Sequence, residues 1–129
     1  MPPIAQWCVY HVSQCRHTIP PKNKYVLIAC LEGMNAWCFF INSEVTQFIK
    51  KRPALHPCMV PIKAAEHSFL RYDSWIDCSS IYDFARHELI SHVGTLSDSC
   101  ATTVVARSQE CKVLQRQYKD MIRQQAGVI

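Results

Sequence analysis

The segment from Cys58 to Phe84 constrains the fold more than any other part of the chain, because two apolar stretches flank a polar loop. Residues 59–62 form a short apolar run, which predicts a buried strand that ends at Lys63. Residues 75–78 are apolar around Asp77, which predicts a second strand. The polar loop between them contains Lys63, Glu66, His67, Arg71 and Asp73. Polar groups held between two strands often carry function, so this loop is a candidate functional segment.

The rest of the chain predicts more strands, one short helix and one long helix. Strands are expected at residues 7–12, 25–31, 37–41 and 89–93, with a hairpin turn at residues 32–35. Residues 44–51 predict a short helix that Asn42 or Ser43 caps and that ends before Pro53. Residues 81–84 predict a short helix or turn. After Ser97, apolar residues recur at helical spacing to about Gln124, which predicts the longest helix.

These elements predict a mainly β (α+β) fold, in which short strands form a small curved barrel and the long C-terminal helix packs on it. The chain has 129 residues, 49% of them hydrophobic, and only three glycines. This composition excludes a largely disordered chain and predicts a single domain over residues 1–129.

Charge and hydropathy limit the classes of partner. The net charge is +4, and the basic residues are spread along the chain, which permits RNA binding. No stretch has the roughly 18 consecutive apolar residues that a membrane span requires. The first residues lack the basic start and apolar core of a signal peptide, so we expect a cytoplasmic protein without a membrane partner.

Eight cysteines are many for a cytoplasmic chain. Most lie within apolar runs, where a reduced cysteine packs as a small hydrophobic residue, and this is the expected state. A zinc site is the alternative, because Cys8, His11, Cys15 and His17 are potential ligands within ten residues. On a strand over residues 7–12, however, Cys8 and His11 would point to opposite faces, so no metal site is expected.

Four segments together resemble the PemK/MazF family of toxin endoribonucleases. VPIK and SWIDCSS are similar to the two central strands of that family, of "VPV" and "GVVRCDQ" type. HTIPPKNKYVLIA is similar to its histidine-bearing loop and "RPVLIV" strand, and HVGTLSDS is similar to the "GRLS" turn before its last helix. The resemblance implies an SH3-like barrel, a homodimer, a cognate antitoxin and a toxin–antitoxin setting.

The resemblance also implies an activity, the metal-independent cleavage of single-stranded RNA without a cofactor. The loop histidine of the family matches His17, its strand arginine lies near Lys24, and its residue after "VPV" matches Lys63. Its arginine and aspartate in "VVRCDQ" match Asp77 and Ser79, so both are changed here. A relocated site would use Arg71 and Lys63 as cations, His17 and His67 as proton carriers and Asp77 as an orienting group. Lys24, Lys63 and Ser79 would then contact RNA.

Two other classes of function stay open. The changes at Asp77 and Ser79 favour a catalytically inactive barrel that binds a protein or nucleic-acid partner, since the gyrase-poison toxins share this fold and act by binding a protein. A cysteine enzyme would pair Cys58 or Cys78 with His67, although buried strand cysteines are normally inert.

Overall fold

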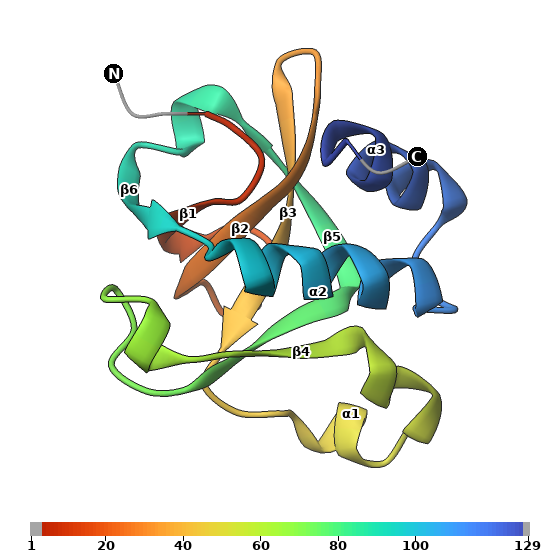
Figure 1. The fold of residues 1–129 in the computed structure, drawn as a ribbon. Coiled ribbons are helices and arrows are strands. Elements are labelled where there is room, and N and C mark those ends of the chain that lie inside the picture. The colour runs from red at the N-terminus through yellow and green to blue at the C-terminus, as the bar shows by residue number, and fades with distance from the viewer. Residues whose placement is uncertain (1–3, 128–129) are drawn as a thin grey trace.

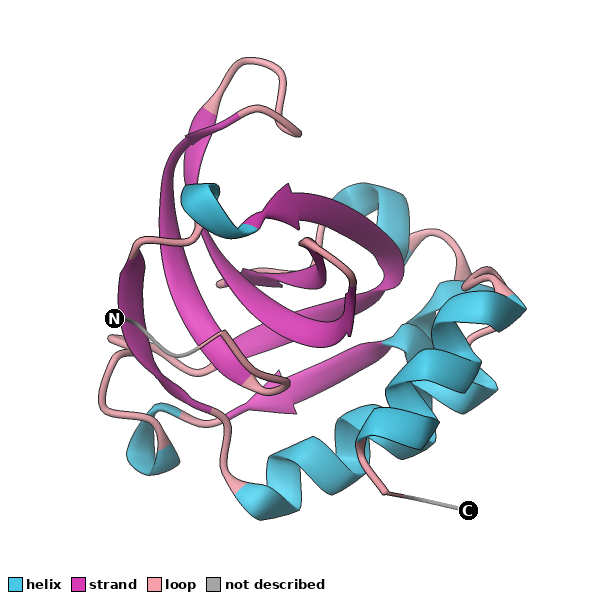
Figure 2. Ribbon diagram, turned by 90° about the horizontal axis from the view of Figure 1, so that it is seen from above, coloured by secondary structure: helices cyan, strands magenta, loops and turns pink. Residues whose placement is uncertain are grey.

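The computed structural model describes residues 4–127, and its framework is one sheet of six antiparallel strands (Figure 1). The strands are β1 (Cys8–Cys15), β2 (Lys22–Glu32), β3 (Asn35–Asn42), β4 (Met59–Ile62), β5 (Ser74–Ala85) and β6 (Ser91–Thr95). Their order across the sheet is β4-β5-β3-β2-β1-β6. The sheet curls into a half-barrel, as Figure 2 shows, which confirms the predicted mainly β fold.

The sheet buries side chains on both of its faces, because the central strands are apolar at both sets of alternating positions. In β2, Leu27 and Ala29 join the core cluster that includes the helices. Val26 and Ile28 point to the other face and join a second cluster with Phe84. The helices cover the first cluster, and the curl of the sheet closes the second (Figure 2).

Strand β5 is much longer than the sequence predicted. Asp77 pairs with Phe40 of β3, and Tyr82 pairs with Cys38, so residues 78–81 lie opposite Phe39 alone. This irregular segment bends the strand and lets pairing resume beyond it. The predicted short helix or turn at residues 81–84 is therefore wrong, because these residues belong to β5, residues 82–84 pair with β3, and Phe84 is buried in the second cluster.

The predicted long C-terminal helix is two helices, α2 (Asp98–Glu110) and α3 (Arg116–Gln125). Ser97 caps α2 as expected, but Cys111 leaves the helical conformation with ψ 112°. A single helix over residues 97–124 would be about 40 Å long and would extend past the sheet. The break instead lets Leu114 and Ile122 reach the same core. The apolar spacing was correct and the continuity was wrong.

Cys111 also forms a disulfide with Cys58, so the expectation of reduced thiols is wrong for this pair. Cys58 ends a 3₁₀ helix, Pro53–Cys58, that the sequence analysis did not predict. The bond joins the start of β4 to the end of α2. Both cysteines are fully buried in the first cluster.

The predicted short helix is shorter and begins later. Helix α1 (Gln47–Lys50) is capped by the Thr46 side chain, not by Asn42 or Ser43. Of its apolar residues, Ile49 is buried but Phe48 is exposed. Among the described residues, no helix is long and apolar enough to cross a membrane.

Replacing Gly94 with alanine should destabilise the fold. Gly94 lies in β6, and an added Cβ would lie 2.5 Å from a ring carbon of Phe69. Relief of this overlap would displace the ring, so we expect a loss of about 1–3 kcal/mol in the free energy of unfolding. Urea denaturation would measure it.

The reason is tested by the double variant Gly94→Ala/Phe69→Leu, in which the smaller side chain should recover part of the loss. Gly94→Ala with unchanged or increased stability would contradict the close approach of Phe69, since a strand glycine without such a neighbour is usually stabilised by alanine.

Candidate functional site

A polar groove of about 470 Å³ lies where the start of β2, the end of β3 and the β4–β5 loop meet. Three cations line it, Lys22 and Lys24 from β2 and Arg71 from the loop. Glu44 adds one carboxylate to this lining. The groove therefore has an excess of positive charge and suits an anionic ligand.

Lys24 is the half-buried cation of the groove. Its Nζ lies 4.9 Å from the centre of the Phe40 ring and donates a hydrogen bond to the side-chain oxygen of Asn42. Burial lowers the pKa of Lys24 and the charge of Lys22 lowers it further, whereas Cys15 and Asp77 act in the opposite direction. The Lys24 ammonium group is thus a positioned and partly desolvated charge, which is the kind that stabilises a developing anion.

Asn42 is a groove residue to which the sequence analysis gave a different role. It is the last residue of β3, and its side chain holds the Lys24 ammonium group instead of capping α1. A local signal existed, because a polar residue directly after an apolar strand lies at the edge of the sheet, where functional groups collect.

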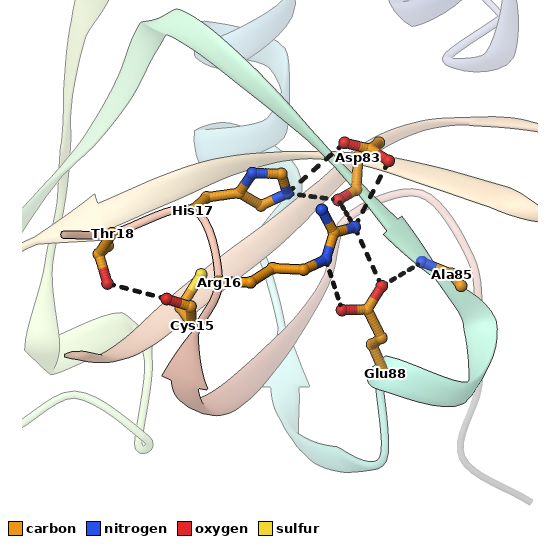
Figure 3. A network of polar contacts seen from close by, with 7 residues as sticks. All are labelled: Cys15, Arg16, His17, Thr18, Asp83, Ala85 and Glu88. Atoms are coloured by element: carbon orange, nitrogen blue, oxygen red, sulfur yellow. Dashed lines mark hydrogen bonds and ion pairs between the residues drawn. The ribbon is translucent and has the colours of Figure 1, made fainter. Parts of the chain in front are cut away.

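His17 lies in a second polar cluster, which Figure 3 shows from close by. Its Nε2 donates a hydrogen bond of 2.7 Å to the backbone oxygen of Asp83 and lies 3.5 Å from the Asp83 carboxylate. A carbonyl oxygen can only accept, so Nε2 carries the proton. Nδ1 has no hydrogen-bond partner among residues 4–127 and is free to accept a proton.

Arg16 holds the same part of β5 in place (Figure 3). One of its guanidinium nitrogens donates to the backbone oxygen of Asp83 at 2.9 Å, and another donates to Glu88 at 2.9 Å. The hydrogen bond from Arg16 lowers the pKa of Glu88, burial opposes this, and the backbone N–H of Ala85 lowers it further. No local pattern in the sequence indicates this contact, because Arg16 is 67 positions from Asp83 and 72 positions from Glu88.

A row of aromatic rings joins the His17 cluster to the groove. The His17 ring lies 5.1 Å from the Tyr82 ring, measured between ring centres. Tyr82 stacks on Phe40 at 4.2 Å, and Lys24 lies over Phe40. His17 and Lys24 are therefore the two ends of one continuous row of side chains that crosses β5 and β3.

Asp77 and Ser79, the two changed positions of the family pattern, bond to each other. The Asp77 carboxylate accepts hydrogen bonds from the backbone N–H of Ser79, at 2.8 Å, and from its hydroxyl. These bonds join Asp77, the last paired residue before the irregular segment of β5, to Ser79 within that segment. Asp77 is bonded to neither His17 nor His67 within the described residues, and it acts on the groove only through its effect on the pKa of Lys24.

His67 lies apart from His17 and is 97% buried, with 3% of its surface exposed. Its Nδ1 donates to the backbone oxygen of Lys63 at 2.8 Å, and its Nε2 accepts from the backbone N–H of Ser97 at 3.0 Å. Both ring nitrogens are therefore occupied, and the ring positions the start of α2. His67 is not part of the groove lining that the structure describes.

Lys63 and Arg71, the two candidate cations of the β4–β5 loop, lie in different surroundings. Lys63 lies 3.8 Å from the Asp73 carboxylate, and the side chains of both are more than half exposed. It is not part of the groove lining that the structure describes, whereas Arg71 is. Of the residues that the sequence predicted, the structure thus brings Lys24 and Arg71 together, places His17 at the far end of the aromatic row and puts Lys63 elsewhere.

Neither Cys58 nor Cys78, the two candidate nucleophiles of the sequence analysis, is available for that role. Cys58 is held in the disulfide, and burial raises the pKa of the fully buried Cys78 thiol well above its ordinary value. The ring nitrogens of His67, the proposed partner of both, are already occupied. Among residues 4–127, no group of three or more His, Cys, Asp or Glu residues is arranged so that it could hold a metal ion.

The side chain of Lys24 should titrate at lower pH than an ordinary lysine, whose pKa is 10.5. Burial disfavours the charged form, so the ammonium group loses its proton earlier as the pH rises. A titration of the lysine ¹³Cε signals by NMR would measure this. Asp77→Asn should lower the midpoint of Lys24 further, because it removes a charge that favours the ammonium form. A midpoint at or above that of the other lysines would contradict the burial of Lys24.

Replacing Glu88 with glutamine should weaken the fold in a pH-dependent way. The folded-state pKa of Glu88 lies below its ordinary value of 4.5, so its contribution to stability is present above that value and is lost as the pH falls through the lowered one. For this partly exposed pair we expect a loss of about 0.5–1 kcal/mol at about pH 7, and almost none at about pH 2. Thermal unfolding across this range, with Glu110→Gln as control, would measure it. An equal loss at both pH values would show that the charge of Glu88 is not the cause.

Comparisons with known proteins identify the fold. No protein-family model and no curated protein sequence matches the chain. Among solved structures, the Mycobacterium tuberculosis toxin MazF-mt6 matches with a TM-score of 0.60 and 19% identity, covering 82% of this chain and 97% of that one. An endoribonuclease in complex with its cognate antitoxin, from mycobacterial species, matches with a TM-score of 0.63 and 11% identity, covering 88% and 98%.

A further solved structure, described as an Mtb toxin, matches with a TM-score of 0.56 and 16% identity over 78% of this chain and 98% of that one. These structures share the curled sheet with this chain over nearly their whole length. The chain therefore has the PemK/MazF-like toxin fold that its four sequence segments predicted.

Proposed function

We propose that this protein is a toxin-like, metal-independent endoribonuclease that cleaves single-stranded RNA. The observation that carries the proposal is the basic groove at the strand ends of a MazF-like fold. The names of two similar structures describe endoribonucleases, which supports the same reaction for this chain. The groove charge supports a polyanionic substrate.

The groove cations would bind the RNA backbone. Lys22 and Arg71 are exposed and would contact phosphates on either side of the cleaved bond. Lys24 would lie closest to the scissile phosphate and stabilise the charge of the pentacovalent phosphorane. Because burial lowers its pKa, its ammonium group is also a better proton donor than that of an ordinary lysine, and it would protonate the leaving 5′-oxygen.

His17 would act as the general base. Its free Nδ1 would accept the proton of the 2′-hydroxyl group, whose oxygen then attacks the neighbouring phosphorus. The bonds from Nε2 to Asp83 fix the ring and would stabilise the imidazolium ion that forms. This reaction requires the scissile phosphate to lie over the row of rings between His17 and Lys24.

The proposal includes the expected partners. One similar structure is an endoribonuclease in complex with its cognate antitoxin, and we propose that an antitoxin inhibits this chain by covering the groove with an acidic segment. The protein would act as a homodimer in the cytoplasm, where its RNA substrate is found, without a membrane partner.

A catalytically inactive barrel that binds a protein or nucleic-acid partner is the second candidate. The observation that favours it is the pair of Asp77 and Ser79, which stand where the resembled family has its arginine and its aspartate, respectively, and which are bonded to each other. In that case the groove would bind a ligand without cleaving it.

Cleavage of RNA in a purified system separates the two candidates. The protein would be incubated with a long, weakly structured RNA in the presence of EDTA, and the products separated on a sequencing gel. We expect cleavage at defined sites. His17→Ala should reduce the rate by about 10²–10⁴, through loss of the base, and Lys24→Ala by about 10²–10³, through loss of charge stabilisation.

Lys112→Ala is the matched control, because Lys112 is exposed between α2 and α3 and lies outside the groove lining. Its rate should equal that of the unmodified protein. RNA that stays intact at micromolar protein would exclude the enzymatic function and favour the binding module. Cleavage that persists in both site variants would place the catalytic residues elsewhere.

A further inference from the structure

Tyr72 is a large aromatic residue beside the cations of the groove, with 64% of its surface exposed. We propose that its ring is a platform on which one nucleobase of the bound single-stranded RNA stacks. This inference rests on the proposed function, because it describes how the same groove would hold its substrate. Single-strand-binding proteins combine these two features, a basic groove and aromatic rings.

The backbone of Tyr72 is anchored on both sides, although its ring is exposed. Before it, Leu70 is buried and its backbone N–H donates to the backbone oxygen of His67 at 3.0 Å. After it, the Asp73 carboxylate accepts from the backbone N–H of Ala64 at 2.9 Å. The loop is therefore tied down where it presents the ring.

One further hydrogen bond holds the backbone of Tyr72 itself. The hydroxyl of Ser74, at the start of β5, donates to the backbone oxygen of Tyr72 at 3.0 Å. Because the backbone that carries the ring is already held, the loop itself does not have to be ordered when a base binds, so more of the stacking energy contributes to affinity.

The nearby cations match the geometry of a nucleotide. The Arg71 guanidinium carbon lies 5.9 Å from the centre of the Tyr72 ring, and Lys22 and Lys24 line the same groove. A base on the ring would place its own phosphate beside Arg71, and the next phosphates would follow the lysines. Stacking tolerates any base, so Tyr72 would set the position of the strand in the groove.

A second pair of arginine and aromatic residue provides the matched control. Arg52 lies over the exposed ring of Phe48 in α1, with 3.7 Å between the guanidinium carbon and the ring centre. Neither residue lines the groove. If any exposed aromatic ring binds RNA, replacing Phe48 should also weaken binding. If binding depends on the groove, only the replacement of Tyr72 should weaken it.

The test is fluorescence anisotropy with a labelled 2′-O-methyl oligoadenylate of about 12 nucleotides, which lacks the nucleophilic hydroxyl group and cannot be cleaved. We expect Tyr72→Ala to weaken binding about 5- to 100-fold, and Tyr72→Phe and Phe48→Ala to leave it unchanged. With a backbone of the same length that lacks bases, Tyr72→Ala should make no difference. That result would assign the effect to a base and not to a phosphate.

Equal binding by Tyr72→Ala and the unmodified protein would overturn the inference, as would an equal loss with Phe48→Ala or no binding of the oligonucleotide. The cleavage assay reports separately on the proposed function. Binding that depends on Tyr72 without cleavage of RNA would retain the platform and exclude the enzyme. RNA cleavage together with binding that Tyr72→Ala does not change would retain the enzyme and exclude the platform.

Discussion

Strands β2 and β3 are apolar on both faces, and the helices can cover only one of them. The second face includes Val26, Ile28 and Cys38, all fully buried, although none of the helices α1, α2 and α3 contributes a residue to this cluster. Water is kept from it because the sheet curls, and the irregular segment of β5 allows this curl by letting residues 78–81 lie opposite one residue of β3. The positions of the groove and of the His17 cluster both follow from this curl.

The curl brings polar groups of distant segments to the rim of the half-barrel. Asp83 lies beyond the irregular segment of β5, and there it meets the loop that carries Arg16 and His17. At the other end of the aromatic row, the ends of β2 and β3 bring Lys24 to Asn42. At each site a polar side chain lies on a buried aromatic ring of the second core cluster. His17 lies against Phe84, and Lys24 lies over Phe40.

Local patterns in the sequence predicted the elements in which buried residues recur at regular spacing. The strands of the central hairpin, the strand Met59–Ile62 and the helical spacing from Val104 to Ile122 follow from alternating or periodic apolar residues. The same patterns failed where a distant contact decides the conformation. Residues 81–84 lack a clear period, and they continue β5 because residues 82–84 pair with β3. The predicted long helix is broken at Cys111.

The candidate site was likewise predicted in part. The family resemblance singled out His17 and Lys24 as candidates, and the polar loop added Arg71. The same loop also suggested His67, whose ring nitrogens are occupied by backbone groups of Lys63 and Ser97. No local signal links Arg16 and His17 to Asp83 and Glu88, since an ion pair leaves no periodic trace in a sequence. The positions of the strands along the chain and the residue types available for chemistry were determined by the sequence alone, because strand burial follows from side-chain alternation. Which of those residues meet was decided by the tertiary structure, because only the curl of the sheet sets their distances and burial.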